Sequence, residues 1–346
     1  MSLHEWLNLA VERQASDIHL SSGLPPVLRV HGRLYSQRDA ALSADQIEAA
    51  AEALMTEPQR QQWSRSADVD GVIEPEGLGR FRFNAFRHHG GPALALRHIP
   101  ARIPNLQDLR VPAVMADLVL RQAGLLLVTG PTGSGKSSTL AALLQHRLQT
   151  RPCHLITLED PIEFLHPAHE GMVHQRQIGT HAADFSQGLR SALREDPDVI
   201  MVGELRDLDT VRLALTAAET GHLVLATLHT AGAARSIDRL IDVFPGEDKP
   251  VVRTMLSESL LAVVSQVLCP GRESGRIAAY EVLVATAAAR NLIRENKVAQ
   301  LYSLMQTGAA QGMQTLDQSL AQSVGQRLVI AEQARRLARN PDNMPP

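Results

Sequence analysis

The sequence predicts an α/β protein in which a parallel sheet carries a phosphate-binding loop, with helices after it and a small α+β domain before it. Residues 125–128 are an uninterrupted apolar run, typical of a strand buried on both faces, and the glycine-rich segment 130–137 follows. Leucines then recur at helical spacing over residues 139–148. Further along the chain, apolar runs alternate with helical patterns. This alternation predicts a parallel sheet with helices on both faces.

Length, charge and cysteine content narrow the class of protein. The 346 residues suggest about two domains. A net charge of −3 and only 3% aromatic residues argue against a nucleic-acid-binding surface. Cys153 and Cys269 form no C-x-x-C pair, which argues against a structural zinc site and for a reducing cytoplasm. The N-terminus carries Glu5 and Glu12, unlike a signal peptide, and the apolar stretch 260–268 is too short to span a bilayer. We therefore expect a soluble cytoplasmic protein.

The beginning of the chain has the pattern of a small α+β domain. Apolar residues at helical spacing predict a first helix, and Ser43 is suited to cap a second one. Alternating patterns predict strands at residues 16–20 and 27–30, and further strands within residues 68–100. We place the N-terminal domain at residues 1–100.

Arginines occupy one face of a predicted hairpin in this domain. Phenylalanines alternate with Arg80 and Arg82, so the rings take one face of the strand and the guanidinium groups the other. A Gly-Gly turn follows, and Arg97 lies on the returning strand. These arginines are candidates for positive charge that acts on another subunit. A solvated sheet face is the alternative explanation.

The second domain is expected at residues 114–340, after a proline-spaced linker at residues 101–113. Its strands after the phosphate loop are predicted at residues 154–158, 198–202 and 222–228, with helices at 185–194 and 208–220. Each of these strands ends in polar residues, namely Glu159-Asp160, Gly203-Glu204 and His229-Thr230. Ligands bind at the carboxyl edge of open α/β sheets, so we expect these groups to act together.

The remainder of the chain is predicted to be mainly helical. The expected elements are a long amphipathic helix at 251–268, a strand at 277–284 and a helical region at 291–324, broken at Gly308 and Gly312. The polar, proline-rich residues 341–346 predict a disordered tail.

The segment from Gly130 to Ser137 fits G-x-x-x-x-G-K-[ST] at every fixed position. Its glycines let successive backbone N–H groups point at a polyphosphate, Lys136 adds a mobile positive charge, and the Ser137 hydroxyl can ligate Mg²⁺. The following helix directs its positive end at the same anion. We predict ATP and Mg²⁺ as cofactors. The predicted nucleotide-binding residues are Gly130, Pro131, Thr132, Gly133, Ser134, Gly135, Lys136, Ser137 and Ser138.

Acidic residues and histidines at the sheet edge supply the remaining chemistry. A Walker B strand ordinarily ends in Asp, but here Gly203 takes that place, so we expect Glu204 to hold magnesium through water. Glu163 belongs to a second acidic cluster, with Glu159 and Asp160.

Two histidines stand at the two ends of the strand predicted at residues 222–228. His229 follows the strand beside the expected phosphate and is the better candidate for a γ-phosphate sensor. His222 begins the same strand, and for it a packing or capping role is an equal alternative.

Together these segments resemble the secretion and type IV pilus traffic ATPases, a hexameric branch of the RecA-like motors. The likeness includes the phosphate loop and the segments ITLEDPIEF, DPDVIMVGELRD and TAAETGHLVLATLHT. It extends to the N-terminal ASDIHLSSGLPPVLRVHG, which is similar to the PAS-like domain of that family. Within the family, the chain looks most like the pilus-retraction branch, since it lacks a tetracysteine motif. The C-terminal A-I-R-N-L-I-R-E segment of that branch is present with Ala289 in place of isoleucine.

The resemblance implies a hexameric, Mg-dependent ATP hydrolase that powers type IV pilus retraction and twitching motility. It implies a RecA-like ATPase domain and functional roles for Glu163, Glu204, His222 and His229, with Arg82 and Arg97 acting in trans. The implied partners are other copies of the chain in a homohexamer, an inner-membrane pilus platform protein and the pilin machinery. The expected location is the cytoplasmic face of the inner membrane, with no direct contact to nucleic acid and contact to the membrane only through partners.

Three alternatives remain open from the sequence. The chain can be an accessory paralogue of the retraction motor, or a related secretion or DNA-uptake motor. The alternative from another class is a nucleotide-gated regulatory scaffold that hydrolyses slowly. Turnover measurement separates the scaffold from a motor, and a filter-binding assay at low salt tests the DNA-uptake motor.

Overall fold

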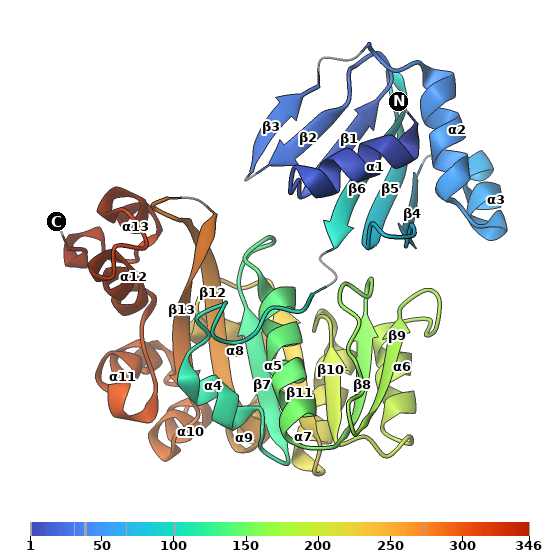
Figure 1. Cartoon of the computed structure of the whole chain (residues 1–346). Helices are drawn as coiled ribbons and strands as arrows, with labels where there is room; N and C mark the ends of the chain where they lie inside the picture. Colours follow the sequence, from blue (N-terminus) through green and yellow to red (C-terminus); the bar gives the residue numbers. More distant parts are fainter. Residues whose placement is uncertain are drawn as a thin grey trace. The chain divides into compact units, whose positions relative to one another are not determined.

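The computed structural model describes residues 2–30, 32–37, 40–66, 68–99, 102–273 and 275–345. The chain forms two compact units, Met1–Arg102 and Ile103–Pro346 (Figure 1). Met1, Pro100, Ala101 and Pro346, which bound the predicted domains, linker and tail, lie outside the described residues. The division after Arg102 falls within the predicted linker.

The first unit is a six-stranded antiparallel sheet with three helices, and the strand order is β3-β2-β1-β6-β5-β4. Its elements are α1 (Leu3–Glu12), β1 (Asp17–Ser21), β2 (Val27–Val30), β3 (Arg33–Ser36), α2 (Ala44–Leu54), α3 (Glu57–Arg65), β4 (Asp68–Ile73), β5 (Arg80–His88) and β6 (Gly91–Ile99). Residues from all three helices share one core with the apolar face of the sheet, including Trp6, Ile47 and Phe83. In the described part of this unit, the helices therefore cover one face of the sheet, and the opposite face carries none.

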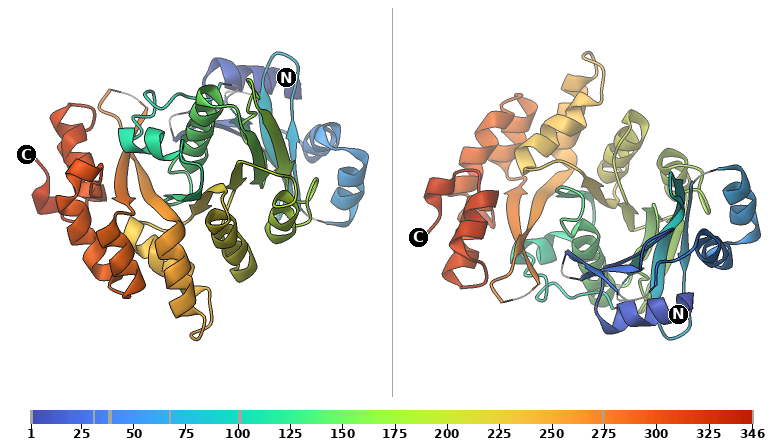
Figure 2. Two further views of the ribbon diagram at one scale, coloured as in Figure 1. Left: turned by 90° about the horizontal axis from the view of Figure 1, so that it is seen from below. Right: turned by 90° about the horizontal axis from the view of Figure 1, so that it is seen from above.

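The second unit has a seven-stranded sheet with helices on both faces (Figures 1 and 2). The strand order is β13-β12-β7-β11-β10-β8-β9, with only β13 antiparallel. The strands are β7 (Gly124–Thr129), β8 (His154–Glu159), β9 (Met172–Gln177), β10 (Val199–Val202), β11 (Leu223–Leu228), β12 (Leu260–Pro270) and β13 (Arg276–Val284). The helices are α4 (Ala113–Leu118), α5 (Lys136–Thr150), α6 (Phe185–Ala192), α7 (Leu208–Glu219), α8 (Ala233–Asp242), α9 (Lys249–Ser259), α10 (Ala287–Arg294), α11 (Leu301–Thr307), α12 (Leu316–Gly325) and α13 (Ala331–Leu337).

Strand β7 shows why this sheet must be covered on both sides. Leu125 and Leu127 belong to one core with the helices α6–α11, whereas Leu126 and Val128 belong to another with α4 and α5. All six residues of β7 are buried. A continuous apolar run is therefore required here, and the predicted α/β fold class with its parallel sheet is confirmed.

The prediction of one long helix at residues 251–268 is wrong. Helix α9 ends at Ser259, and β12 then pairs in parallel with β7 and antiparallel with β13. The stretch from Leu260 onward is apolar on both faces because both faces of β12 are buried. Periodicity alone cannot separate such a strand from a buried helix, and the valines at 263, 264 and 267 favour the strand.

The C-terminal end also differs from the expected disordered tail. Pro341–Asn343 form a 3₁₀-helix, and Met344 is buried in a cluster that includes Leu320 and Ala334. One apolar side chain among polar residues therefore anchors the described part of the tail.

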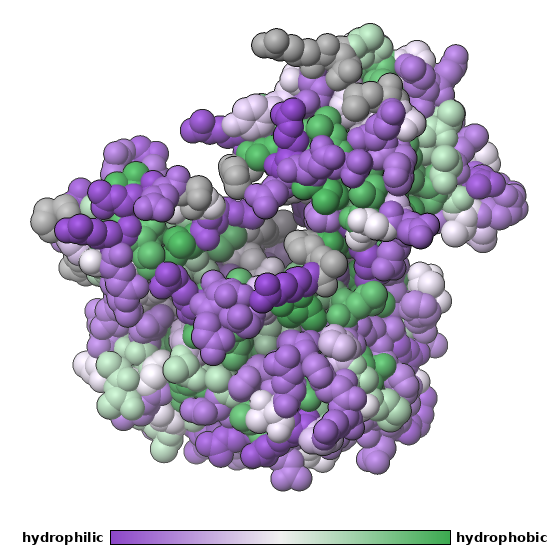
Figure 3. All heavy atoms as spheres, viewed as in Figure 1, coloured by the Kyte–Doolittle hydropathy of each residue, from purple (hydrophilic) through white to green (hydrophobic). Residues whose placement is uncertain are grey.

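Among the described residues, no helix is long and apolar enough to cross a membrane. In the face shown in Figure 3, hydrophilic residues are spread over the surface between smaller apolar areas.

Candidate functional site

The phosphate loop joins β7 to α5, and glycine is required in it for conformational reasons. Gly130, Gly133 and Gly135 have φ values of 142°, 77° and 91°, which L-residues with a Cβ rarely adopt. A Cβ at Gly130 would also collide with the backbone oxygen of Gln266. The loop therefore turns tightly against β12 before α5 begins at Lys136.

Lys136 lies inside the curve of this loop and is 8% exposed. Its Nζ donates to the carbonyl oxygens of Gly130 at 2.8 Å and Pro131 at 3.1 Å. Burial lowers the pKa of Lys136, and the nearby charges of Glu204 and Glu163 oppose that shift. The loop thus surrounds one ammonium group, as a phosphate-binding site requires.

The neighbouring serines fit a polyphosphate with a metal ion. Ser137 is exposed at the first turn of α5, so its hydroxyl is accessible to a cation. Ser134 Oγ is buried and has no hydrogen-bond partner among the described residues. A buried hydroxyl without a partner beside an ammonium group is consistent with a site built to receive further oxygen atoms.

Glu204, which follows β10, connects to the phosphate loop through His229. Its Oε2 lies 3.3 Å from His229 Nε2, and His229 Nδ1 lies 3.3 Å from Thr132 Oγ1 in the loop. Arg206 Nη2 lies 2.7 Å from the same carboxylate oxygen, and this contact raises the pKa of Arg206. The structure therefore brings Glu204, His229 and the loop together, as predicted from the strand ends.

Gly203 explains why the usual Walker B carboxylate is displaced by one residue. A Cβ at this position would lie 3.1 Å from the carbonyl oxygen of Leu158, closer than such contacts normally come. Thr227 Oγ1 also donates to the carbonyl oxygen of Gly203. A side chain at position 203 would press against the Leu158 carbonyl group, and Glu204 is the first residue after β10 that carries a side chain.

The three carboxylates at and after the end of β8 have different surroundings. Glu159 is buried and accepts hydrogen bonds from Thr157 Oγ1 at 2.6 Å and Gln175 Nε2 at 3.0 Å. Burial raises the pKa of Glu159. Asp160 is exposed, whereas Glu163 is half-buried. Of these three carboxylates, Glu163 is the one whose charge raises the pKa of Lys136.

His222 lies away from this edge. It precedes β11, and its Nδ1 lies 3.1 Å from the carbonyl oxygen of Ala217. His229 follows the same strand at the other end, so about 20 Å of extended backbone separates the two histidines. Within one chain, His222 is not part of the phosphate site, and its contacts are those of a residue that ends a helix.

Gln266 on β12 is part of the site but escaped the sequence prediction. It is 2% exposed, its Oε1 accepts from Thr139 Oγ1 at 2.7 Å, and its Nε2 donates to the carbonyl oxygen of Ser134 at 2.7 Å. In the sequence, Gln266 is marked only as a single amide within the apolar run 260–268. Because that run was assigned to a helix, the amide had no predicted neighbour. Arg206 escaped too, since an exposed arginine after a strand has no distinctive pattern.

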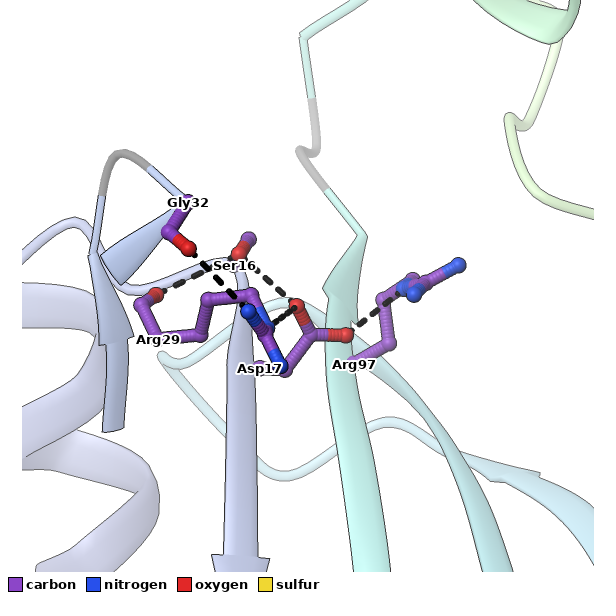
Figure 4. Close-up of polar contacts among 5 residues, drawn as sticks. All are labelled: Ser16, Asp17, Arg29, Gly32 and Arg97. Atoms are coloured by element: carbon purple, nitrogen blue, oxygen red, sulfur yellow. Dashed lines mark hydrogen bonds and ion pairs between the residues drawn. The ribbon is translucent and has the colours of Figure 1, made fainter. Parts of the chain in front are cut away.

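Arg82 and Arg97 lie in the first unit, directly opposite each other on β5 and β6. Arg97 Nε donates to Asp17 Oδ1 at 2.8 Å (Figure 4). Arg82 makes a longer ion pair, 3.7 Å from Nη2 to Asp70 Oδ1. The prediction that they share one face of the hairpin is confirmed, since register and alternation place both opposite the core.

Comparison with known proteins gives consistent matches over nearly the whole chain. Residues 2–336 match the family described as Type II/IV secretion system protein. The chain is 48% identical over 343 residues to the Type IV pilus retractation ATPase PilT of Pseudomonas aeruginosa, covering 99% of this chain and 100% of that protein. It is 48% identical over 320 residues to a Twitching motility protein of Neisseria gonorrhoeae, covering 92% and 86%. The crystal structure of the pilus retraction motor PilT with bound ADP matches with a TM-score of 0.90 and 44% identity over 99% of both chains.

Proposed function

Because the chain belongs to the Type II/IV secretion system protein family, we propose that it is the ATP-driven motor that retracts a type IV pilus. The chain is a nucleotide-binding ATP hydrolase of that family. One observation carries the retraction function: the 48% identity to a retraction ATPase spans both units rather than the phosphate loop alone. A shared ATPase fold by itself would leave the substrate of the motor open.

We assign the phosphate end of ATP to the loop around Lys136. Its ammonium group already has two carbonyl partners, and phosphate oxygens would replace them with charged acceptors in a buried setting. Ser137 would hold Mg²⁺ directly and Glu204 would hold it through water, and the bound ion would neutralise charge on the phosphates. The exposed hydroxyl and the partly buried carboxylate support this assignment.

We assign Glu163 to the orientation of the attacking water, because its charge already acts at Lys136. His229 is suited to sense the γ-phosphate, since it contacts both Thr132 of the loop and Glu204. A change at the phosphate end of the nucleotide would therefore reach the carboxylate through one side chain. We assign no role to His222 in the site of its own chain.

The remaining positive charge would come from another copy of the chain. We propose a homohexameric ring in which Arg82 or Arg97 completes the site of an adjacent subunit. The ring would act at the cytoplasmic face of the inner membrane, through a pilus platform protein and the pilin machinery. It would neither insert into the bilayer nor bind nucleic acid directly.

Deletion of the gene, followed by imaging of surface pili, tests this function. We expect pili to accumulate and retraction to stop. The wild-type gene should restore retraction, whereas the Lys136→Ala variant should not. Normal retraction in the deletion strain would reject a primary retraction role and favour the accessory paralogue. A purified protein without measurable turnover would favour the regulatory scaffold.

A further inference from the structure

A row of charged residues crosses the face of the first unit that carries no helices. Strand register pairs Asp17 with Arg29 on one side and with Arg97 on the other, and Arg97 with Arg82 beyond it. Ile18, which alternates with Asp17, lies in the core. The row therefore consists of three arginines around one carboxylate.

Asp17 divides its two oxygen atoms between different partners (Figure 4). Oδ1 accepts from Arg97 Nε at 2.8 Å. Oδ2 accepts from Ser16 Oγ at 2.8 Å and lies 3.7 Å from Arg29 Nε. Arg29 also donates through Nη1 to the carbonyl oxygen of Gly32 at 3.1 Å. Ser16 and Arg29 thus hold Oδ2 of Asp17, and Oδ1 holds Arg97.

Asp17 and Arg97 differ sharply in exposure. The side chain of Asp17 is 11% exposed, whereas that of Arg97 is 62% exposed. The buried carboxylate of Asp17 therefore holds Arg97, which extends into solvent. Arg29 offsets the negative charge of Asp17, so Arg29, Asp17 and Arg97 together retain one net positive charge.

The hydrogen bond to Asp17 uses Nε of Arg97, which is one of the three nitrogen atoms of its guanidinium group. Asp17 engages Nε, and among the described residues neither Nη1 nor Nη2 of Arg97 forms a hydrogen bond or ion pair. The two terminal nitrogens of a guanidinium group can bind two oxygens of one phosphate. Arg82 differs, because its Nη2 faces Asp70 at 3.7 Å and both side chains are exposed.

We propose that Asp17 is a positioning residue that aligns Arg97 as the arginine acting on the nucleotide of an adjacent subunit. This inference rests on the proposed trans-acting role and selects Arg97 over Arg82. An arginine that is already oriented loses less side-chain freedom when the site closes. Asp17 would act on turnover only through Arg97 and would leave the phosphate loop unaffected.

A double-mutant cycle on the full-length protein tests the proposal. Asp17→Asn should lower kcat by about tenfold or more, as expected for a misaligned charged group, with the Kd for ATP unchanged. Asp17→Glu should restore part of kcat. Arg97→Ala should lower kcat more than Asp17→Asn does. Adding Asp17→Asn to the Arg97→Ala variant should lower kcat no further. The matched control is Glu48→Gln, which removes the carboxylate of the 2.6 Å pair with Arg87 in the same unit and should leave kcat unchanged.

Each outcome decides between distinct claims. If Asp17→Asn keeps wild-type kcat, Asp17 does not act through Arg97. The same holds if the decreases in kcat caused by Asp17→Asn and Arg97→Ala add in full in the double variant. If Arg97→Ala itself turns over normally, the trans-acting assignment fails together with the role of Asp17. Should Asp17→Asn not fold, Arg97→Lys decides: its single nitrogen cannot hold Asp17 and grip a phosphate with two donors. A fully active Arg97→Lys variant would overturn the proposal.

Discussion

Lys136 shows most directly how burial and charge combine at the scale of single residues. The residue is 8% exposed, burial lowers the pKa of its ammonium group, and the charges of Glu204 and Glu163 oppose that shift. Its acceptors among the described residues are two carbonyl oxygens, which are weaker acceptors than phosphate oxygens. These contacts support the proposed role of Lys136 in binding phosphate.

Lys136→Ala is therefore expected to abolish hydrolysis and to weaken ATP binding sharply. The variant removes the mobile cation that the loop places at the β- and γ-phosphates. Turnover assays and a titration with labelled ATP measure both effects. Near-wild-type turnover would show that the phosphate-loop assignment is wrong.

Glu204 and Glu163 should fail in different ways when each is changed to alanine. Glu204→Ala removes the partner of Arg206 and His229 and should weaken magnesium-dependent hydrolysis. Glu163→Ala should leave ATP bound but poorly attacked, with a loss in rate on the order of 10²-fold. Glu170→Gln, at an exposed carboxylate to which no role is assigned, is the control. Full activity of the Glu163 variant would move the catalytic role to another residue.

His166 makes a pH-dependent contribution to stability. It is 8% exposed, and burial lowers its pKa from 6.5 to about 4. The unfolded chain then binds more protons than the folded chain between these values. Stability should be fully present above pH 6.5 and fall as the pH drops towards 4, by about 2–3 kcal/mol.

His166→Gln should flatten this part of the stability curve, whereas His4→Gln, at an exposed histidine, should not. Denaturant unfolding between pH 4 and pH 7 measures the difference. Equal slopes in the two variants would show that His166 does not make this contribution.

At the scale of secondary-structure elements, β12 supports the phosphate loop from beside β7. Gln266 on this strand bonds to both Thr139 of α5 and Ser134 of the loop. Ser265 Oγ on the same strand accepts from the N–H of Gly232 at 2.8 Å, just before α8. One strand thus fixes the backbone of the phosphate loop and of the residue before α8.

Gln266→Leu is expected to destabilise the second unit and to raise the KM for ATP. The change leaves the buried Thr139 hydroxyl and the Ser134 carbonyl without a partner, at a cost of about 1–3 kcal/mol each. Thermal unfolding and steady-state kinetics test this, with Gln306→Leu at an exposed position as control. An unchanged KM would mean that β12 does not set the geometry of the loop.

The elements predicted correctly from sequence were those with a strong local pattern. β7, β8, β10 and β11 each contain a dominant apolar run, and Ser43 caps α2 as expected. β9 was missed because it is a partly exposed edge strand of mixed polarity, and α3 because its apolar content is low. The site followed from strand ends, but Gln266 and Asp17 depend on neighbours far away in sequence, which no local pattern reveals.

At the scale of the whole molecule, the phosphate loop and the candidate arginines belong to different units. Lys136 and Glu204 lie in the second unit, whereas Arg82 and Arg97 lie in the first. A site completed by another subunit would couple closure of the interface between subunits to the state of the γ-phosphate. Such coupling is what a motor needs to convert hydrolysis into motion.

Mixing two strongly impaired variants tests this central claim most directly. Lys136→Ala subunits retain the arginine, and Arg97→Ala subunits retain the phosphate loop. In a randomly mixed ring, about a quarter of the interfaces would join an intact loop to an intact arginine. ATP turnover should therefore rise in the mixture well above that of Lys136→Ala, which is inactive alone, and of Arg97→Ala, which keeps only residual turnover alone. A mixture no more active than its components, or full hydrolysis by an isolated monomer, would contradict a site shared between subunits.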